Sequence, residues 1–222
     1  MRSIAVVPAR DEAGSVGATV RALEPLVDDV VVVDDASTDG TAAAALVAGA
    51  SVLHASRRRG KGRAVEEALG RLEPAEIWLF ADADLGSTAG RLGPLVAAVR
   101  EGHADVAIAV FAKLQGGGFG IVKAMAGRTI GRLTGSEPRE PLSGQRALSA
   151  AALATVRPLA PGFGLETAMT IDAVRAGLRV VEIPIDGLSH RATGRGARGF
   201  AHRARQGLDI LAAVATRVLR HR

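Results

Sequence analysis

Short apolar runs alternate with amphipathic stretches along most of the chain. The runs are almost continuously apolar, as at 77–80, while the stretches between them place apolar residues at helical spacing. Strands of this kind are buried on both faces, which requires helices on both sides of a mostly parallel sheet. The sequence therefore predicts an α/β fold with a mostly parallel, Rossmann-like central sheet flanked by helices. We expect strands at 4–7, 30–33, 51–53, 77–80, 106–110 and 180–185, and helices at 15–23, 41–47, 63–72, 92–100 and 200–222.

Polar residues follow three of these predicted strands at their carboxyl ends. The three clusters lie at 8–12, 34–40 and 82–84. The carboxyl ends of parallel strands meet at one edge of a sheet, and α/β proteins bind their ligands beyond that edge. Three strand ends with the same chemistry are better evidence than any one of them, so we expect a functional site there.

Two carboxylates, Asp82 and Asp84, follow the predicted strand at 77–80, with one residue between them. Alternate residues of a strand point to the same side, so both carboxylates would face one site. Such a concentration of negative charge favours a divalent cation, and a cation bound to a diphosphate is the obvious ligand. An Asp-rich turn that merely ends the strand explains the motif about equally well.

Further candidates come from the neighbouring clusters. Asp35 could accept the imide proton of uracil or guanine, and Glu12 could bind ribose hydroxyls, whereas Ser37 and Asp39 are expected to be structural. The segment Gly60-Lys-Gly-Arg63 precedes a helix and offers Lys61 to phosphates. It does not match a Walker P-loop, and a solvated basic turn is the alternative.

Candidates in the second half of the chain are less specific. Glu166 near a predicted helix start could be a general base or bind acceptor hydroxyls, but acids at helix starts are also common for dipole reasons. After the strand at 180–185, His190 could ligate a metal, and Arg191 and Arg195 could clamp a diphosphate. The glycine-rich segment at 113–120 fits a mobile acceptor loop or an ordinary linker.

Composition restricts the partners. The net charge of +5 suits a phosphorylated substrate, a nucleic acid or an anionic membrane. Aromatic residues make up only 3% and Tyr is absent, which argues against a base-stacking surface for nucleic acid. Without cysteine there is neither a disulfide nor a thiolate metal site, and a cytoplasmic location is the default expectation. No apolar run approaches the ~20 residues that span a bilayer, and we expect the helix at 200–222 to pack on the domain rather than lie on a membrane.

Taken together, these motifs resemble the GT-A-fold, family 2 type of nucleotide-sugar glycosyltransferase, and most of all its dolichyl- or polyprenyl-phosphate sugar synthases. The matching motifs are P-A-R-D-E at 8–12, V-V-D-D-A-S-T-D-G-T at 32–41, G-K-G-R-A at 60–64, A-D-A-D-L at 81–85 and S-G-Q-R at 143–146. The resemblance extends from Ile4 to about Gln206 and also includes features of glucosyl-3-phosphoglycerate synthases, namely a histidine after the last strand and G-F-G-L-E at 162–166.

The resemblance implies a role for each matching residue. Asp84 would bind Mg2+ or Mn2+, with His190 as a further metal ligand, and Asp84, Glu166 and Arg191 would serve the reaction. Substrate would contact Pro8, Arg10, Glu12, Val33, Asp35, Lys61, Asp82, Ala83, Arg146 and Arg195.

Two features depart from the family pattern. Gly86 stands two residues after Asp84, where some members place a glutamine as a metal ligand. The metal shell must then be completed by the diphosphate, water or His190. The sequence also lacks the membrane-spanning tail of many polyprenyl-phosphate enzymes, which weakens the case for a lipid acceptor.

We therefore expect one GT-A domain, 1–222, with a nucleotide-sugar half at 1–110, an acceptor half at 111–199 and a C-terminal helix at 200–222. Its expected activity is metal-dependent transfer of a hexose, glucose or mannose, from a nucleoside-diphosphate sugar to a phosphate-bearing acceptor, first of all polyprenyl phosphate. The alternatives are transfer to a small acceptor such as 3-phosphoglycerate, or nucleotide-sugar binding without catalysis. Peripheral contact with the cytoplasmic face of a membrane and a homodimer stay open, and no nucleic-acid partner is expected.

Overall fold

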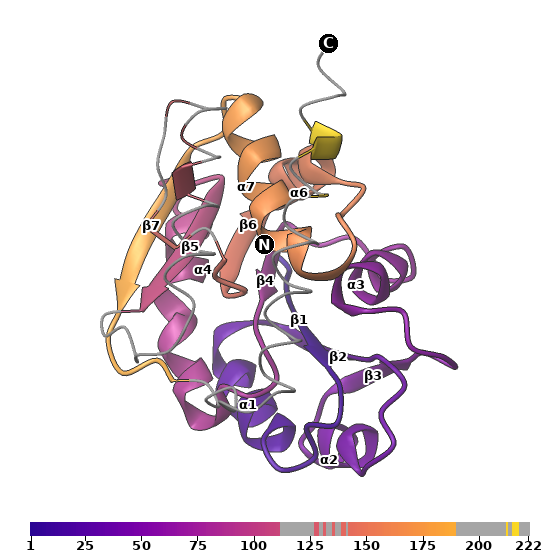
Figure 1. Ribbon diagram of the computed structural model, residues 1–222. Coiled ribbons are helices and arrows are strands. Elements are labelled where there is room, and N and C mark those ends of the chain that lie inside the picture. The colour runs from indigo at the N-terminus through magenta and orange to yellow at the C-terminus, as the bar shows by residue number, and fades with distance from the viewer. Residues whose placement is uncertain are drawn as a thin grey trace.

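The computed structural model describes residues 1–111, 127–128, 131, 135, 139–140, 142–189, 212 and 215–217. A mixed seven-stranded sheet forms the centre of the molecule, and helices cover both of its faces (Figure 1). The strands are β1 (Ser3–Ala9), β2 (Asp29–Asp34), β3 (Ser51–His54), β4 (Ile77–Phe80), β5 (Val106–Phe111), β6 (Arg146–Ser149) and β7 (Val180–Ile185). The α-helices are α1 (Val16–Leu23), α2 (Thr41–Val47), α3 (Lys61–Leu69), α4 (Gly93–Arg100), α6 (Ala150–Val156) and α7 (Leu165–Arg175), and the 3-10 helices are η1 (Glu24–Leu26), η2 (Gly86–Leu92) and η3 (Gly162–Gly164).

The strand order is β3-β2-β1-β4-β6-β5-β7. The pairs β1–β2, β1–β4, β2–β3 and β5–β7 are parallel, whereas β6 runs antiparallel to both β4 and β5. This architecture confirms the predicted α/β class and the mostly parallel sheet.

Two hydrophobic layers, one on each face of the sheet, hold the helices in place. Alternate strand residues point to opposite faces, so Val7 and Leu79 pack with α1, α2 and α4, while Val6 and Phe80 pack with α3, α6 and α7. Figure 1 shows these helices on either side of the strands. The strands are apolar throughout because both of their faces are covered.

The direction in which successive strands are added to the sheet reverses at β1. It adds β2 and then β3 on one side of β1 and returns to place β4 on the other side. In an open α/β sheet this switch point leaves a crevice at the carboxyl ends of the strands. The polar clusters at 8–12, 34–40 and 82–84 follow the adjacent strands β1, β2 and β4, as the sequence predicted.

The antiparallel strand β6 was missed by the sequence analysis. Its four residues, Arg146–Ser149, have no distinctive period. The first three are buried, and the strand lies inside the sheet because β4 and β5 pair with it on both sides. Since β6 is antiparallel, its first residue, Arg146, pairs with Phe80, the last residue of β4. The S-G-Q-R motif therefore reaches the same edge of the sheet as Asp82. The following helix α6 was also not predicted.

Of the predicted C-terminal helix at 200–222, the structure describes only 212 and 215–217, and these residues are helical. Arg217 is 6% exposed and forms an ion pair of 2.8 Å with Asp172 of α7. The Arg175 guanidinium also donates to the carbonyl of Arg217 (2.9 Å). These contacts agree with the expectation that the segment packs on the domain. Within the described part of the chain, no helix has the length and apolarity needed to cross a membrane.

Candidate active site

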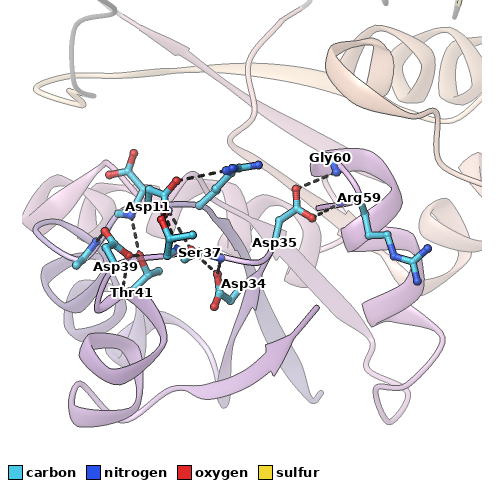
Figure 2. Close-up of polar contacts among 12 residues, drawn as sticks. Asp11, Asp34, Asp35, Ser37, Asp39, Thr41, Arg59 and Gly60 are labelled. Carbon is cyan, nitrogen blue, oxygen red and sulfur yellow. Dashed lines mark hydrogen bonds and ion pairs between the residues drawn. The ribbon is translucent and has the colours of Figure 1, made fainter. Parts of the chain in front are cut away.

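Side-chain hydrogen bonds join the loop after β1 to the loop after β2 (Figure 2). The Thr38 N–H donates to the Asp11 carboxylate (2.8 Å), and the Asp11 N–H donates to the Ser37 hydroxyl (3.0 Å). The Thr38 N–H holds the pKa of Asp11 below its usual range. Asp11 has a left-handed φ of 53°, which Asp and Asn tolerate better than most residues. This conformation is one that the Asp at position 11 can adopt at little cost.

Asp39 and Thr41 make the second connection between these loops. The buried Thr41 hydroxyl accepts the Glu12 N–H (2.8 Å), and Asp39 accepts the N–H groups of Thr41 (2.9 Å) and Ala13 (3.2 Å). Hydrogen bonding, from the Thr41 hydroxyl above all, lowers the pKa of Asp39. Ser37 and Asp39 thus do structural work, as expected, and this work fixes the position of Glu12.

Asp35 directly follows β2 and binds the loop that leads into α3. It is 6% exposed, and its two carboxylate oxygens accept the backbone N–H groups of Arg59 (2.5 Å) and Gly60 (2.8 Å), as Figure 2 shows. The carboxylate therefore sets the start of α3, the helix whose first residue is Lys61. Recognition of a nucleobase by Asp35 stays a prediction.

Lys61 lies between two carboxylates that are distant in the sequence. Its ammonium donates to Asp82 (2.7 Å) and to Glu166 (2.8 Å). The Lys61 side chain is 26% exposed and that of Glu166 is 8% exposed, so water screens these ion pairs only partly. Burial acts to lower the pKa of Lys61, but Asp82 and Glu166 outweigh it and hold the pKa above the ordinary value of a lysine.

The S-G-Q-R segment packs against the other side of Asp82. The buried Gln145 side chain donates to the second carboxylate oxygen of Asp82 (2.7 Å). Gly144 leaves no room for a side chain, because a Cβ there would lie 2.7 Å from Asp82 Oδ2 and 2.9 Å from Lys61 Nζ. Asp82 is therefore held by charge on one side and by an amide on the other.

Arg146 is buried beneath this cluster rather than directed to solvent. It is 1% exposed and donates to the carbonyls of Ser143 (2.5 Å) and Glu166 (3.1 Å). Burial lowers the pKa of Arg146 to about 10, against the opposing effects of Glu166 and Asp82, so the guanidinium stays charged at pH 7. We now assign it a positioning role for the segments carrying Ser143 and Glu166, while direct contact with substrate stays a prediction.

Asp82 and Asp84 do not lie in a strand. Because β4 ends at Phe80, the alternation of side chains used to place both carboxylates on one face does not reach them, and that argument was wrong. Asp84 instead lies in a turn between buried Ala83 and Leu85 and is itself partly exposed. A carboxylate oxygen suits Mg2+ or Mn2+. Among the described residues no three His, Asp or Glu side chains form a metal cluster. The further ligands of a cation at Asp84 would come from the substrate, from water or from a residue outside the described part of the chain, such as the predicted ligand His190.

The remaining predicted site residues fall into two groups. Pro8 and Arg10 lie at the carboxyl end of β1, Val33 lies near the end of β2, and Arg10 donates to Asp11 (3.3 Å). One terminal nitrogen of Arg10 is buried without a hydrogen-bond partner in the part of the chain that is described. The second group, His190, Arg191 and Arg195, lies outside the described residues, as does the glycine-rich segment at 113–120.

Three residues that shape the site were missed from the sequence, namely Thr19, Gly144 and Gln145. Thr19 is a hydroxyl residue on the buried, otherwise apolar face of α1, beside Val16 and Val20, and this placement was the available signal. Gly144 and Gln145 belong to a motif that was noticed for its arginine alone.

Gly62, in the first turn of α3, offers a test of this packing. A glycine-to-alanine change inside a helix normally stabilises by about 1 kcal/mol. At Gly62 the new Cβ would lie 2.0 Å from the Ala160 carbonyl oxygen, in the loop before Glu166. We expect Gly62→Ala to destabilise the protein by about 2 kcal/mol instead, measured by urea unfolding. Gly70→Ala at the end of the same helix, with its nearest contact at 3.5 Å, should have no such cost.

Comparisons with known proteins agree with this geometry. The sequence pattern described as "Glycosyl transferase family 2" matches residues 4–150. Glycosyltransferase AglJ of Haloferax volcanii is 31% identical over 160 residues, which cover 70% of this chain and 52% of that protein. Glucosyl-3-phosphoglycerate synthase of Mycolicibacterium paratuberculosis is 30% identical over 210 residues, which cover 81% of this chain and 63% of that protein. The chain thus spans between half and two thirds of the length of these two relatives.

Solved structures of a similar enzyme hold ligands. The structure of glucosyl-3-phosphoglycerate synthase from Mycobacterium tuberculosis with Mg2+ and UDP has a TM-score of 0.83 and 25% identity, and the match covers 97% of this chain and 79% of that one. The structure of the same enzyme with Mn2+, UDP and phosphoglyceric acid has a TM-score of 0.82 and 26% identity, with 97% and 78% of the two chains covered.

Proposed function

The chain belongs to glycosyl transferase family 2, and we propose that it transfers glucose from UDP-glucose to 3-phosphoglycerate or a similar small phosphorylated acceptor, with Mg2+ or Mn2+. This is the second of the two transfer reactions expected from the sequence. The observation that carries it is the likeness, over 97% of this chain, to an enzyme that binds Mn2+, UDP and phosphoglyceric acid together. UDP is the diphosphate that remains when UDP-glucose gives up its sugar, which is why we name this donor.

We assign the expected binding residues to the parts of the donor as follows. Asp35 and Glu12, after β2 and β1, would take the nucleoside, and Asp84, after β4, would hold the metal at the diphosphate. When bound, the metal would neutralise charge that develops on the departing diphosphate. Lys61, Asp82 and Glu166 form one hydrogen-bonded cluster and would surround the sugar.

Lys61 forms ion pairs with both carboxylates, Asp82 and Glu166, and so influences the role that each can have. Its ammonium contacts one oxygen of each carboxylate, at 2.8 Å from Glu166 and 2.7 Å from Asp82, and so fixes the positions of both side chains. We therefore propose that Glu166 and Asp82 mainly accept hydrogen bonds from sugar hydroxyls, each held in place by Lys61. Glu166 as the general base for a hydroxyl acceptor stays the alternative role.

The proposal is tested by following UDP release from UDP-glucose with 3-phosphoglycerate, with Mn2+, with Mg2+ and with EDTA. We expect release that requires both the metal and the acceptor. GDP-mannose in place of UDP-glucose tests the donor. If product formed with polyprenyl phosphate and partitioned into an organic phase, and none formed with 3-phosphoglycerate, the results would support transfer to a lipid acceptor instead. Donor binding without product on any acceptor would favour a non-catalytic binding protein. A cytoplasmic location and a homodimer stay predictions.

A further inference from the structure

We propose that Thr19 is a positioning residue for Asp84, acting through the backbone of the turn that carries it. This inference rests on the proposed function, in which Asp84 holds the divalent cation. Thr19 lies on α1 and is 0% exposed, and it is 64 residues away from Ala83 in the sequence.

One hydroxyl binds the turn on both sides of Asp84. Thr19 Oγ1 donates to the carbonyl of Ala83 (2.9 Å) and accepts the N–H of Gly86 (2.8 Å). The first partner is immediately before Asp84 and the second is two residues after it. Both roles of the hydroxyl are used, one as donor and one as acceptor. The turn is therefore closed against α1 by a side chain rather than by a backbone hydrogen bond.

Apolar contacts complete this anchoring. Ala83 and Leu85, the neighbours of Asp84, are each 2% exposed and belong to the core layer that also contains Val16 and Val20 of α1. A backbone carbonyl or N–H in such a place costs free energy when it has no partner. The Thr19 hydroxyl removes that cost, and it does so in the conformation that leaves Asp84 partly exposed between two buried residues.

The expected effect is on metal affinity. Partners that orient a metal ligand without touching the metal typically change metal affinity by about 10- to 100-fold when they are lost. Thr19→Val keeps the shape of the side chain and removes the hydroxyl, so the turn loses both hydrogen bonds. Thr19→Ser keeps the hydroxyl and should restore them.

Titration calorimetry of UDP at a series of Mn2+ concentrations measures this effect without turnover. We expect Thr19→Val to need about tenfold more Mn2+ for the same UDP affinity, and Thr19→Ser to behave like the wild type. Ser3→Ala is the matched control, because Ser3 is also 0% exposed and its hydroxyl also bridges two groups, both of Asp28, at the opposite edge of the sheet. It should cost stability and leave the Mn2+ requirement unchanged.

Hydrogen exchange in the metal-free wild type supplies a second readout. It remains informative even if a variant misfolds, because it is measured on the unchanged protein. The Gly86 amide should be protected, and in Thr19→Val it should exchange faster. A fast-exchanging Gly86 amide in the wild type, or a Thr19→Val protein with wild-type Mn2+ dependence, would overturn the assignment. A wild type that binds no UDP at any Mn2+ concentration would instead overturn the proposed function.

Discussion

Asp84→Asn is expected to lower kcat with UDP-glucose and 3-phosphoglycerate by about a thousandfold at saturating Mn2+. The change removes the negative charge that would hold the cation while it keeps nearly the same shape. Metal ions at such sites stabilise the charge of the transition state by several kcal/mol, and each 1.36 kcal/mol is a factor of ten in rate. Steady-state release of UDP measures the effect, and raising the Mn2+ concentration should recover only part of it.

Two controls bound this prediction. Glu73→Gln removes an exposed carboxylate from the loop before β4 and should leave kcat unchanged. Thermal unfolding of metal-free Asp84→Asn measures any change in stability and so separates a loss of chemistry from a loss of folding. An Asp84→Ala protein that turns over at the normal rate would refute the metal-binding role outright.

Lys61→Met is expected to cost about 3 kcal/mol of stability, because removing one partner of a largely buried ion pair leaves uncompensated charge. Here two carboxylates, Asp82 and Glu166, would lose the ammonium that lies 2.7–2.8 Å from both. Urea unfolding measures the change. Arg63→Met, on the exposed face of the same helix, also removes one positive charge and should stay within about 0.5 kcal/mol.

The stability that Lys61 contributes changes with pH in a direction that follows from its raised pKa. The pKa of Lys61 in the folded protein lies above its ordinary value, so the stabilisation it supplies is fully present below about pH 10 and is lost only as the pH rises through the folded pKa. Between pH 7 and pH 9 the stability difference from Lys61→Met should therefore be constant. Adding Glu166→Gln should recover part of the loss, because one of the two abandoned charges is then removed. If Glu166→Gln changed the stability by the same amount in the wild type and in Lys61→Met, Lys61 and Glu166 would not be coupled.

Residues in local patterns could be placed from the sequence. The strands at 77–80 and 180–185 and the helix at 41–47 have the predicted bounds, because continuous apolar runs and helical spacing are read within a few residues. The polar clusters after β1, β2 and β4 could also be assigned to one edge, since parallel strands carry their carboxyl ends to the same side. Family membership followed from the same short motifs.

Contacts between distant segments could not be placed. The sequence shows Lys61, Asp82 and Glu166 as three separate candidates, each of which also has a purely structural explanation. They meet because α3 begins two residues earlier than its apolar spacing indicated and because β6 enters the sheet antiparallel beside β4. Strand pairing of this kind depends on long-range partners that no local period records.

Arg146 and Thr19 show the same difference between what local sequence indicates and what tertiary contacts determine. The motif around Arg146 marked the residue as important, but its burial beneath Glu166 depends on the pairing of β6 with β4. Thr19 is unremarkable in the sequence and gains its role because α1 packs against the turn after β4. The sequence by itself determined which chemical groups stand at the strand ends, because a strand end is a local property. Only the tertiary structure decided which of them are held by charge, which are buried and which reach the solvent, because those properties arise from neighbours that the chain brings together by folding.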